Sequence, residues 1–146
     1  MTDVPRRARF AELTTAELYA LLNLRAAVFV VEQSCAYQDL DGRDTEPQTV
    51  HLWYERDGAP VAYLRVLAEE DGAARIGRVC TTATARGDGL AGRLVDAALT
   101  VVGDRPCLLE AQSYLADFYA RYGFRRTAPE YLEDGIPHIP MARPRP

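Results

Sequence analysis

The sequence has little that would draw the chain to nucleic acid or to a membrane. Its 17 basic residues are outnumbered by 21 acidic ones, which leaves a net charge of −4 and no overall positive field for a polyanion. No apolar run approaches the roughly 20 residues of a membrane-spanning helix, and the residues from Met1 to Arg7 form no apolar leader. We therefore expect a soluble, cytoplasmic protein with no nucleic-acid or membrane partner.

Cysteine is also scarce. The three cysteines, Cys35, Cys80 and Cys107, are odd in number and widely spaced, and they contain no Cys-x-x-Cys pair. This pattern is against a disulfide framework and against a structural zinc site, so we expect reduced thiols and no metal. No repeat, linker or low-complexity segment divides the 146 residues, and 48% of them are apolar. That composition predicts a single domain over residues 1–146 with one proper core.

The first predicted helix begins after a capping box at residues 14–17. The Thr14 hydroxyl can accept a hydrogen bond from the Glu17 amide, and the Glu17 carboxylate can reach back to the Thr14 amide. Apolar residues follow at helical spacing, and the β-branched run at residues 28–31 indicates where the helix weakens. Arg25 interrupts the apolar stripe, so we expect its stem to pack and its head to meet a carboxylate or carbonyl at the rim.

An acidic segment from Ser34 to Thr49 follows this helix. It is longer than an ordinary connection, and such loops often carry binding residues. We expect its carboxylates to be solvated. A negatively charged loop beside a substrate site would favour a cationic substrate. These carboxylates are Asp39, Asp41, Asp44 and Glu46.

The remaining pattern predicts an α+β fold. Strands are expected at residues 51–55, 61–68 and 75–82, separated by the turn signals Asp57-Gly58 and Asp71-Gly72. The next elements are a helix from Leu90, a strand at 107–112, a helix closed by Gly123, and strands at 124–127 and 138–143. We expect a mixed, mostly antiparallel central sheet with helices on both faces.

A glycine-rich turn, Arg86-Gly87-Asp88-Gly89-Leu90-Ala91, lies between a predicted strand and an amphipathic helix. Free amides at a helix start bind anions, and the missing Cβ atoms of the glycines let diphosphate oxygens approach the backbone. Glycine can also serve a tight turn for conformational reasons alone. No Lys-Ser/Thr follows, and the preceding strand belongs to an antiparallel meander, which favours a diphosphate ligand without magnesium. The Asp88 carboxylate must then point away.

Two spaced motifs resemble those of the GCN5-related N-acetyltransferases. Arg86-x-x-Gly89-x-Ala91 is similar to the Q/R-x-x-G-x-G/A signature of that family, and Phe118-Tyr119-x-x-x-Gly123-Phe124 is similar to its second signature. The resemblance extends from the first helix to the last strand. Residues 28–33, 37–42 and 134–138 look particularly like the ElaA-type branch. Ala83 and Gln112 depart from the family pattern, since many members have proline and asparagine there.

The resemblance implies an acyl-coenzyme A donor, most simply acetyl-CoA. In the family the fourth and fifth strands splay apart, the pantetheine arm lies in the gap, and a fourth-strand amide faces the thioester oxygen. Tyr119 matches the tyrosine that protonates the departing thiolate, and a phenol with a pKa of about 10 can serve a thiolate whose acid is near 8.5. The implied cofactor contacts are Val79, Cys80, Thr81, Arg86, Gly87, Asp88, Gly89, Leu90, Ala91, Gly92 and Gln112.

The base that deprotonates the acceptor is less determined by the sequence. Glu32, His51, Glu110 and His138 are all candidates, as is a relaying water. Glu32 ranks first because it follows the first helix, where the acceptor groove of such enzymes begins. Cys80 has no His or acid neighbour in the sequence, so a covalent acyl-enzyme is disfavoured.

These residues predict direct transfer of an acetyl group to a primary amine within a ternary complex. The acceptor is expected to be a small molecule or a peptide, and a homodimer is left open. One alternative is a module that binds acyl-CoA, or regulates through it, without catalysis. Another is O-acylation or homoserine-lactone synthesis, since residues 28–33 also resemble the lactone synthases.

Overall fold

An eight-stranded sheet organises the chain in the computed structural model, which describes residues 4–146. Residues 1–3, which begin the segment without an apolar leader, lie outside the described residues. The strand order is β1-β2-β3-β4-β5-β8-β6, and β7 pairs with β8. Its strands are β1 (Arg6–Arg9), β2 (Val50–Arg56), β3 (Ala59–Ala68), β4 (Ala74–Thr81), β5 (Cys107–Gln112), β6 (Arg125–Arg126), β7 (Tyr131–Glu133) and β8 (Ile136–Arg143).

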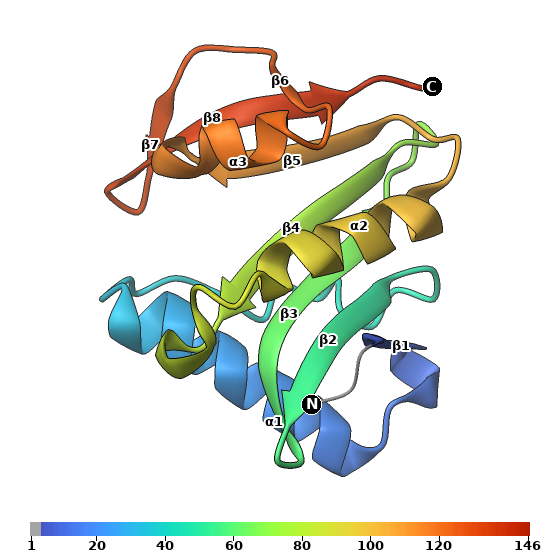
Figure 1. Cartoon of the computed structure of the whole chain (residues 1–146), viewed down its shortest axis with the longest axis vertical. Coiled ribbons are helices and arrows are strands. Elements are labelled where there is room, and N and C mark those ends of the chain that lie inside the picture. The colour runs from blue at the N-terminus through green and yellow to red at the C-terminus, as the bar shows by residue number, and fades with distance from the viewer. Residues whose placement is uncertain (1–3) are drawn as a thin grey trace.

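Three α-helices accompany the sheet: α1 (Thr15–Arg25), α2 (Leu90–Val102) and α3 (Ala116–Ala120). Figure 1 shows α2 and α3 in front of the sheet and α1 behind it. The apolar stripe of α2 packs with strand side chains and with Tyr119 and Phe124 in the larger core. Leu21 and Leu24 of α1 pack with Trp53 and other residues in a second cluster. The α+β prediction, with a mostly antiparallel sheet and helices on both faces, is therefore confirmed.

The capping box at the start of α1 is present as predicted. The Glu17 amide donates to the Thr14 hydroxyl at 3.0 Å, and the Thr14 amide donates to the Glu17 carboxylate at 2.9 Å. The chain does not leave the helix at the β-branched run, because residues Ala26–Glu32 continue as a π-helical segment. π-Helical turns are rare and frequently lie at functional sites. Here the wider turn carries Glu32 at its end.

Two strands were not expected from the sequence. β1 consists of Arg6, Arg7, Ala8 and Arg9 and pairs antiparallel with β2, although it has no apolar alternation. β7 is a three-residue strand that pairs only with β8. Both are defined by their partners in the sheet, which a local pattern does not reveal. Between residues 4 and 146, none of the helices combines the length and apolar character needed to cross a bilayer.

The acidic segment is not the solvated loop that we expected. Asp39 and Asp44 are buried, and Arg25 is only 1% exposed instead of lying at the rim. The Arg25 guanidinium lies 3.2 Å from the Asp39 carboxylate and 2.7 Å from that of Asp44, so its expected carboxylate partner is confirmed. Arg65 adds ion pairs to Asp44 and Asp41. Buried charges need such partners, because desolvation of an unpaired ion is costly.

Candidate functional site

A cavity of about 730 Å³ lies where β4 and β5 separate. The two strands pair in parallel only at Ala74 with Cys107 and at Arg75 with Leu108. Beyond that point they diverge, and Figure 1 shows the gap widening toward the C-terminal ends of both strands. The splayed strands that the family resemblance implied are therefore present. Of the predicted site residues, the cavity wall contains Glu32, Val79, Cys80, Thr81, Arg86, Ala91, Gln112 and Tyr119.

A β-bulge shapes the β4 side of this cavity. Tyr63 of β3 pairs with Cys80, but Arg65 pairs with Gly77, so β4 has one extra residue in this interval. Arg78 has a φ of +54°, a backbone conformation that costs an L-residue roughly 1 kcal/mol or more. A bulge leaves its extra residue outside the ladder. Backbone amides around Arg78 and Val79 are therefore released from regular pairing where the strand faces the cavity.

The glycine-rich turn leads directly into α2. Gly87 has φ +88° and Gly89, the N-cap, has φ +77°, so both positions need the freedom of glycine. A Cβ at either residue would meet no described atom within 4 Å, which means that the turn is open on its outer side. No described side chain caps the helix. The amides of the first turn are thus available to an anion.

The other members of the turn divide into three roles. Leu90 is 1% exposed and its side chain belongs to the core, so only its backbone can contact a ligand. A Cβ at Gly92 would collide with the Tyr122 hydroxyl, so this glycine also permits the close approach of Tyr122, which follows α3. Asp88 lies 2.9 Å from Arg56. The ion pair with Arg56 neutralises the Asp88 carboxylate, which would otherwise repel an anion bound at the turn.

Arg86 and Glu32 are brought together by the fold. The Arg86 guanidinium lies 2.6 Å from the Glu32 carboxylate, and it also donates to the Thr81 carbonyl at 3.0 and 3.1 Å. Residues from the π-helical segment, the end of β4 and the glycine-rich turn therefore meet at one edge of the cavity. A second hydrogen bond joins the end of β5 to the residue after the π-helical segment, since the Gln112 amide donates to the Gln33 side chain at 3.4 Å.

Tyr119 reaches the cavity from α3 although it is only 5% exposed. Its ring packs edge-to-face against Phe118 and Phe124. Burial, with a smaller contribution from Tyr114, raises the pKa of the Tyr119 phenol above its ordinary value. The phenol therefore keeps its proton throughout the neutral range. Packing and a chemical role are compatible here, because the Tyr119 side chain belongs to the core and also lines the cavity.

The candidate bases are now separated by position. His51 is buried outside the cavity wall, with Nδ1 2.6 Å from the Tyr63 hydroxyl, and burial lowers its pKa. Glu110 lies on the wall but is held by Arg75 and by the Tyr131 hydroxyl, each at 3.0 Å. His138 also lines the cavity. Its Nδ1 is 2.8 Å from the Ile136 carbonyl, which can only accept, so Nδ1 carries the proton and Nε2 is left as an acceptor.

Cys80 lies in the cavity wall but is 5% exposed. Burial raises the pKa of its thiol to about 12. A thiol with that pKa is protonated at neutral pH and is a poor nucleophile. The site therefore offers no activated cysteine at this position.

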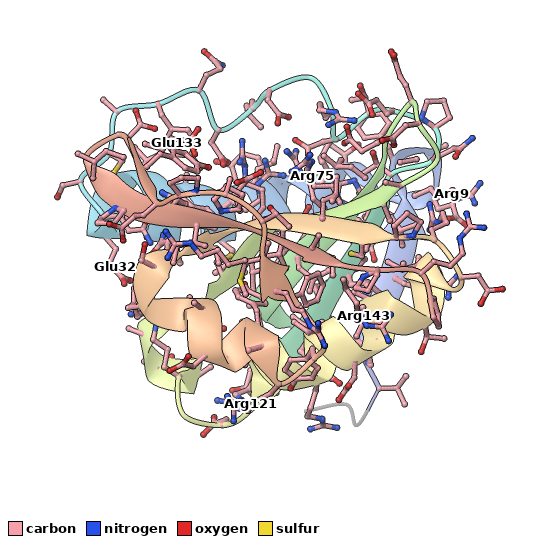
Figure 2. All side chains as sticks on the ribbon, turned by 90° about the horizontal axis from the view of Figure 1, so that it is seen from above. Arg9, Glu32, Arg75, Arg121, Glu133 and Arg143 are labelled. Carbon is pink, nitrogen blue, oxygen red and sulfur yellow. The ribbon has the colours of Figure 1, made fainter. Side chains whose placement is uncertain are left out.

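The negative charge of the acidic segment is already neutralised within the chain. Asp39, Asp41 and Asp44 pair with arginines of α1, β3 and β4. Glu46 pairs with Arg43. The attraction of a cationic substrate by this loop stays a prediction. The cavity wall also contains Glu133 at the end of β7 and Asp134 in the turn that follows, and the sequence analysis had proposed neither as a site residue. Figure 2 shows Glu133 and Glu32 toward the same end of the molecule, with Arg75 nearer its middle.

Comparison with known proteins agrees with this geometry. A family model described as an acetyltransferase (GNAT) domain matches residues 15–144. A UPF0039 protein of Mycobacterium tuberculosis is 50% identical over 148 residues, which cover 99% of this chain and 95% of the relative.

Two similar crystal structures have the same architecture. An acyl-CoA N-acyltransferase from Pseudomonas aeruginosa has a TM-score of 0.88 and 48% identity, covering 95% of this chain and 98% of its own. ElaA from Escherichia coli has a TM-score of 0.90 and 40% identity, covering 95% and 97%. Family model, relatives and solved structures thus agree along almost the whole sequence: the chain belongs to the GNAT acetyltransferase family and is an acyltransferase.

Proposed function

We propose that this acyltransferase moves an acetyl group from acetyl-CoA to a primary amine by direct attack within a ternary complex. The observation that carries the proposal is the separation of β4 from β5, which opens one cavity between the start of α2 and Tyr119. A donor bound at the α2 turn can extend along β4, while an acceptor enters from the side of Glu32 and Glu133.

The donor site is built mainly from backbone. Amides at the start of α2 would hold the diphosphate, because they point outward at the positive end of the helix dipole. The unpaired edge of β4 would hydrogen-bond the pantetheine arm. Amides of the bulge at Arg78 and Val79 would face the thioester oxygen and stabilise the negative charge that develops during attack.

Proton transfer requires an acid for the sulfur and a base for the amine. We assign Tyr119 as the acid, because its phenol is protonated and reaches the cavity. Glu32, Glu110 and His138 are the candidate bases on the wall, and Glu110 is held by Arg75 and the Tyr131 hydroxyl. Glu32 is engaged by Arg86, whereas the Nε2 of His138 is an acceptor in the tautomer that the Ile136 carbonyl selects. The variants Glu32→Gln and His138→Gln distinguish them, since the base variant should lose the acidic limb of the pH profile of kcat/KM.

The acceptor is expected to arrive as an ammonium ion, because primary amines are protonated at neutral pH. Glu133 and Asp134 line the cavity, and neither takes part in an ion pair among the described residues. The arginines of the same wall are paired in the chain, for example Arg75 with Glu110 and Arg86 with Glu32. The acidic residues beyond the donor turn therefore favour a cationic acceptor.

The test is thiol release from acetyl-CoA in the presence of polyamines, amino acids, aminoglycosides and peptides. At least one acceptor should raise the rate, and Tyr119→Phe should lower kcat by about 10²-fold or more, as expected for loss of a general acid. Tyr19→Phe is the control, because Tyr19 is 76% exposed on α1. Full activity of Tyr119→Phe would contradict the acid role.

The alternative is a module that binds acyl-CoA without catalysis. Acetyl-CoA would then raise the melting temperature by mass action, but no acceptor would increase thiol release. The tyrosine at the cavity wall and the bulge on the β4 side of the cavity favour the enzyme, since binding alone requires neither.

A further inference from the structure

Arg78 is an unusual residue for the middle of a strand. Four described residues other than glycine have a positive φ, and Ser34, Asp57 and Asp134 lie in turns. Only Arg78 among these four lies within a strand. Glycine would adopt this conformation without strain. Arginine adopts this conformation at a cost in backbone strain, so we expect the contacts of its side chain to offset that strain.

The side chain of Arg78 is clamped by the acidic segment. Its Nε lies 2.8 Å from the Asp39 carboxylate, in an ion pair that lacks hydrogen-bond geometry, and its Nη2 donates to the Asp39 carbonyl at 3.1 Å. A longer contact of 3.4 Å joins Nη2 to Asp41. The guanidinium also lies over the ring of Tyr37, 5.4 Å from its centroid. Arg78 thus has both ionic and aromatic partners on one loop.

The clamp is anchored in the interior. Asp39 receives the Tyr37 hydroxyl at 2.6 Å and the Arg25 Nε at 3.2 Å. Arg25 continues to Asp44, which also binds Arg65 of β3. The Asp39 carboxylate that holds Arg78 is therefore fixed by Arg25 of α1 and by Tyr37 of its own loop, and Asp44 links Arg25 to Arg65 of β3.

The contact between Arg78 and Asp39 joins the β4 wall of the cavity to the wall formed by the acidic segment. Arg78 and Val79 lie on the β4 wall, and Tyr37 and Gln38 line the same cavity from the acidic segment. We propose that Arg78 is a positioning residue, whose contact with Asp39 holds the β4 bulge in register with the acidic segment and so fixes the bulge amides relative to the acceptor. This inference rests on the proposed acyl transfer, in which those amides face the thioester oxygen.

The alternative is that the contact contributes to folding alone. A folding contact would lower the free energy of unfolding and the protection of amides that exchange through global unfolding, with no selective effect on residues 77–81 or on kcat. A positioning contact changes the mobility of β4 and the rate of the chemical step, while the α2 turn continues to bind the diphosphate. The two roles therefore differ in hydrogen exchange and in the division of the effect between kcat and cofactor affinity.

The test compares Arg78→Gly with Arg78→Lys and Arg43→Gln. Arg78→Gly removes the clamp and also relieves the backbone strain, so the fold should survive. Arg78→Lys retains a charge for Asp39 but cannot form the same pair of contacts. Arg43 is the matched control, because it anchors the same segment through Glu46 at 3.1 Å and Glu69 at 2.8 Å without lining the cavity.

Hydrogen exchange of residues 77–81 in the free protein tests the clamp without any substrate. We expect Arg78→Gly to raise exchange there by about tenfold or more, corresponding to about 1.4 kcal/mol; Arg78→Lys should give a smaller increase and Arg43→Gln none. In the acyl-transfer assay, kcat should fall about tenfold in Arg78→Gly, while the dissociation constant of coenzyme A changes less than about twofold.

Each result decides a separate point. Unchanged exchange in Arg78→Gly would overturn the clamp. Raised exchange with an unchanged kcat would overturn the positioning role. Absence of transfer by the wild-type protein with every acceptor would contradict the proposed function and, with it, the catalytic part of this inference, whereas the exchange data would still decide whether Arg78 holds the bulge.

Discussion

The turn that opens α2 provides the most demanding prediction: Gly89→Val should weaken coenzyme A binding more than Arg86→Ala. Gly89 has φ +77°, where a β-branched residue is a genuine outlier. The strain is roughly 1–2 kcal/mol. A turn that relaxes to avoid it moves amides away from the diphosphate, and each charge-assisted hydrogen bond is worth about 1.5–3 kcal/mol. Loss of two such bonds corresponds to about 3 kcal/mol or more, or at least about 100-fold in the dissociation constant.

Arg86 should matter less, because its guanidinium is already occupied. It binds the Thr81 carbonyl and the Glu32 carboxylate, and it must give up those contacts to reach a phosphate. The exchange of one half-exposed ion pair for another is worth only about 1 kcal/mol. Arg86→Ala should therefore weaken binding by roughly fivefold.

Isothermal titration with coenzyme A measures both effects, and circular dichroism confirms that each variant is folded. Gly103→Val is the control for strain, since Gly103 caps the opposite end of α2 at φ +63°. It should lower the melting temperature without changing the affinity. A larger effect of Arg86→Ala than of Gly89→Val would mean that the side chain, not the backbone, holds the diphosphate. An equal loss of affinity in Gly103→Val would attribute the effect to general destabilisation.

Three further predictions concern packing and charge. Gly92→Ala should destabilise the wild-type protein by about 1 kcal/mol more than it destabilises the Tyr122→Phe variant, because the added Cβ would collide with the Tyr122 hydroxyl. Additive effects of the two substitutions on the free energy of unfolding in urea would contradict this. Arg25→Met should lower the free energy of unfolding by about 3 kcal/mol, because two buried carboxylates lose a partner but each keeps a second arginine; a loss below about 1 kcal/mol would contradict this. Burial holds the pKa of His51 below its unfolded value of about 6.5, so the unfolded chain binds the proton more readily and stability falls as the pH drops through that value. His51→Gln should flatten this part of the stability profile between pH 7 and 5, and an unchanged slope would refute the assignment.

Local signals predicted much of the fold correctly. The capping box at Thr14, the apolar stripe of α2 and the turn glycines before it depend on residues a few positions apart. The strand at Cys107–Gln112 was expected with the bounds that it has. Such elements are predictable because their patterns reflect the period of the element itself.

Interactions between distant residues were not predictable in the same way. β1 is a strand because β2 offers it a partner, although its arginines carry no alternating pattern. The bulge at Arg78 depends on the register between β3 and β4, and arginine is not a residue that signals a positive φ. The acidic segment was interpreted as solvated because its arginine partners come from three other elements.

By itself, the sequence determined the family and predicted the donor turn, because Arg86 to Ala91 and Phe118 to Phe124 are contiguous motifs whose spacing is part of the chain. Only the tertiary structure decided how the site is assembled. It pairs Arg86 with Glu32 across 54 positions and gives Arg78 its partner across 39. These contacts depend on where β4 leaves β5 and on which charges are buried together, and both follow from packing of the whole sheet.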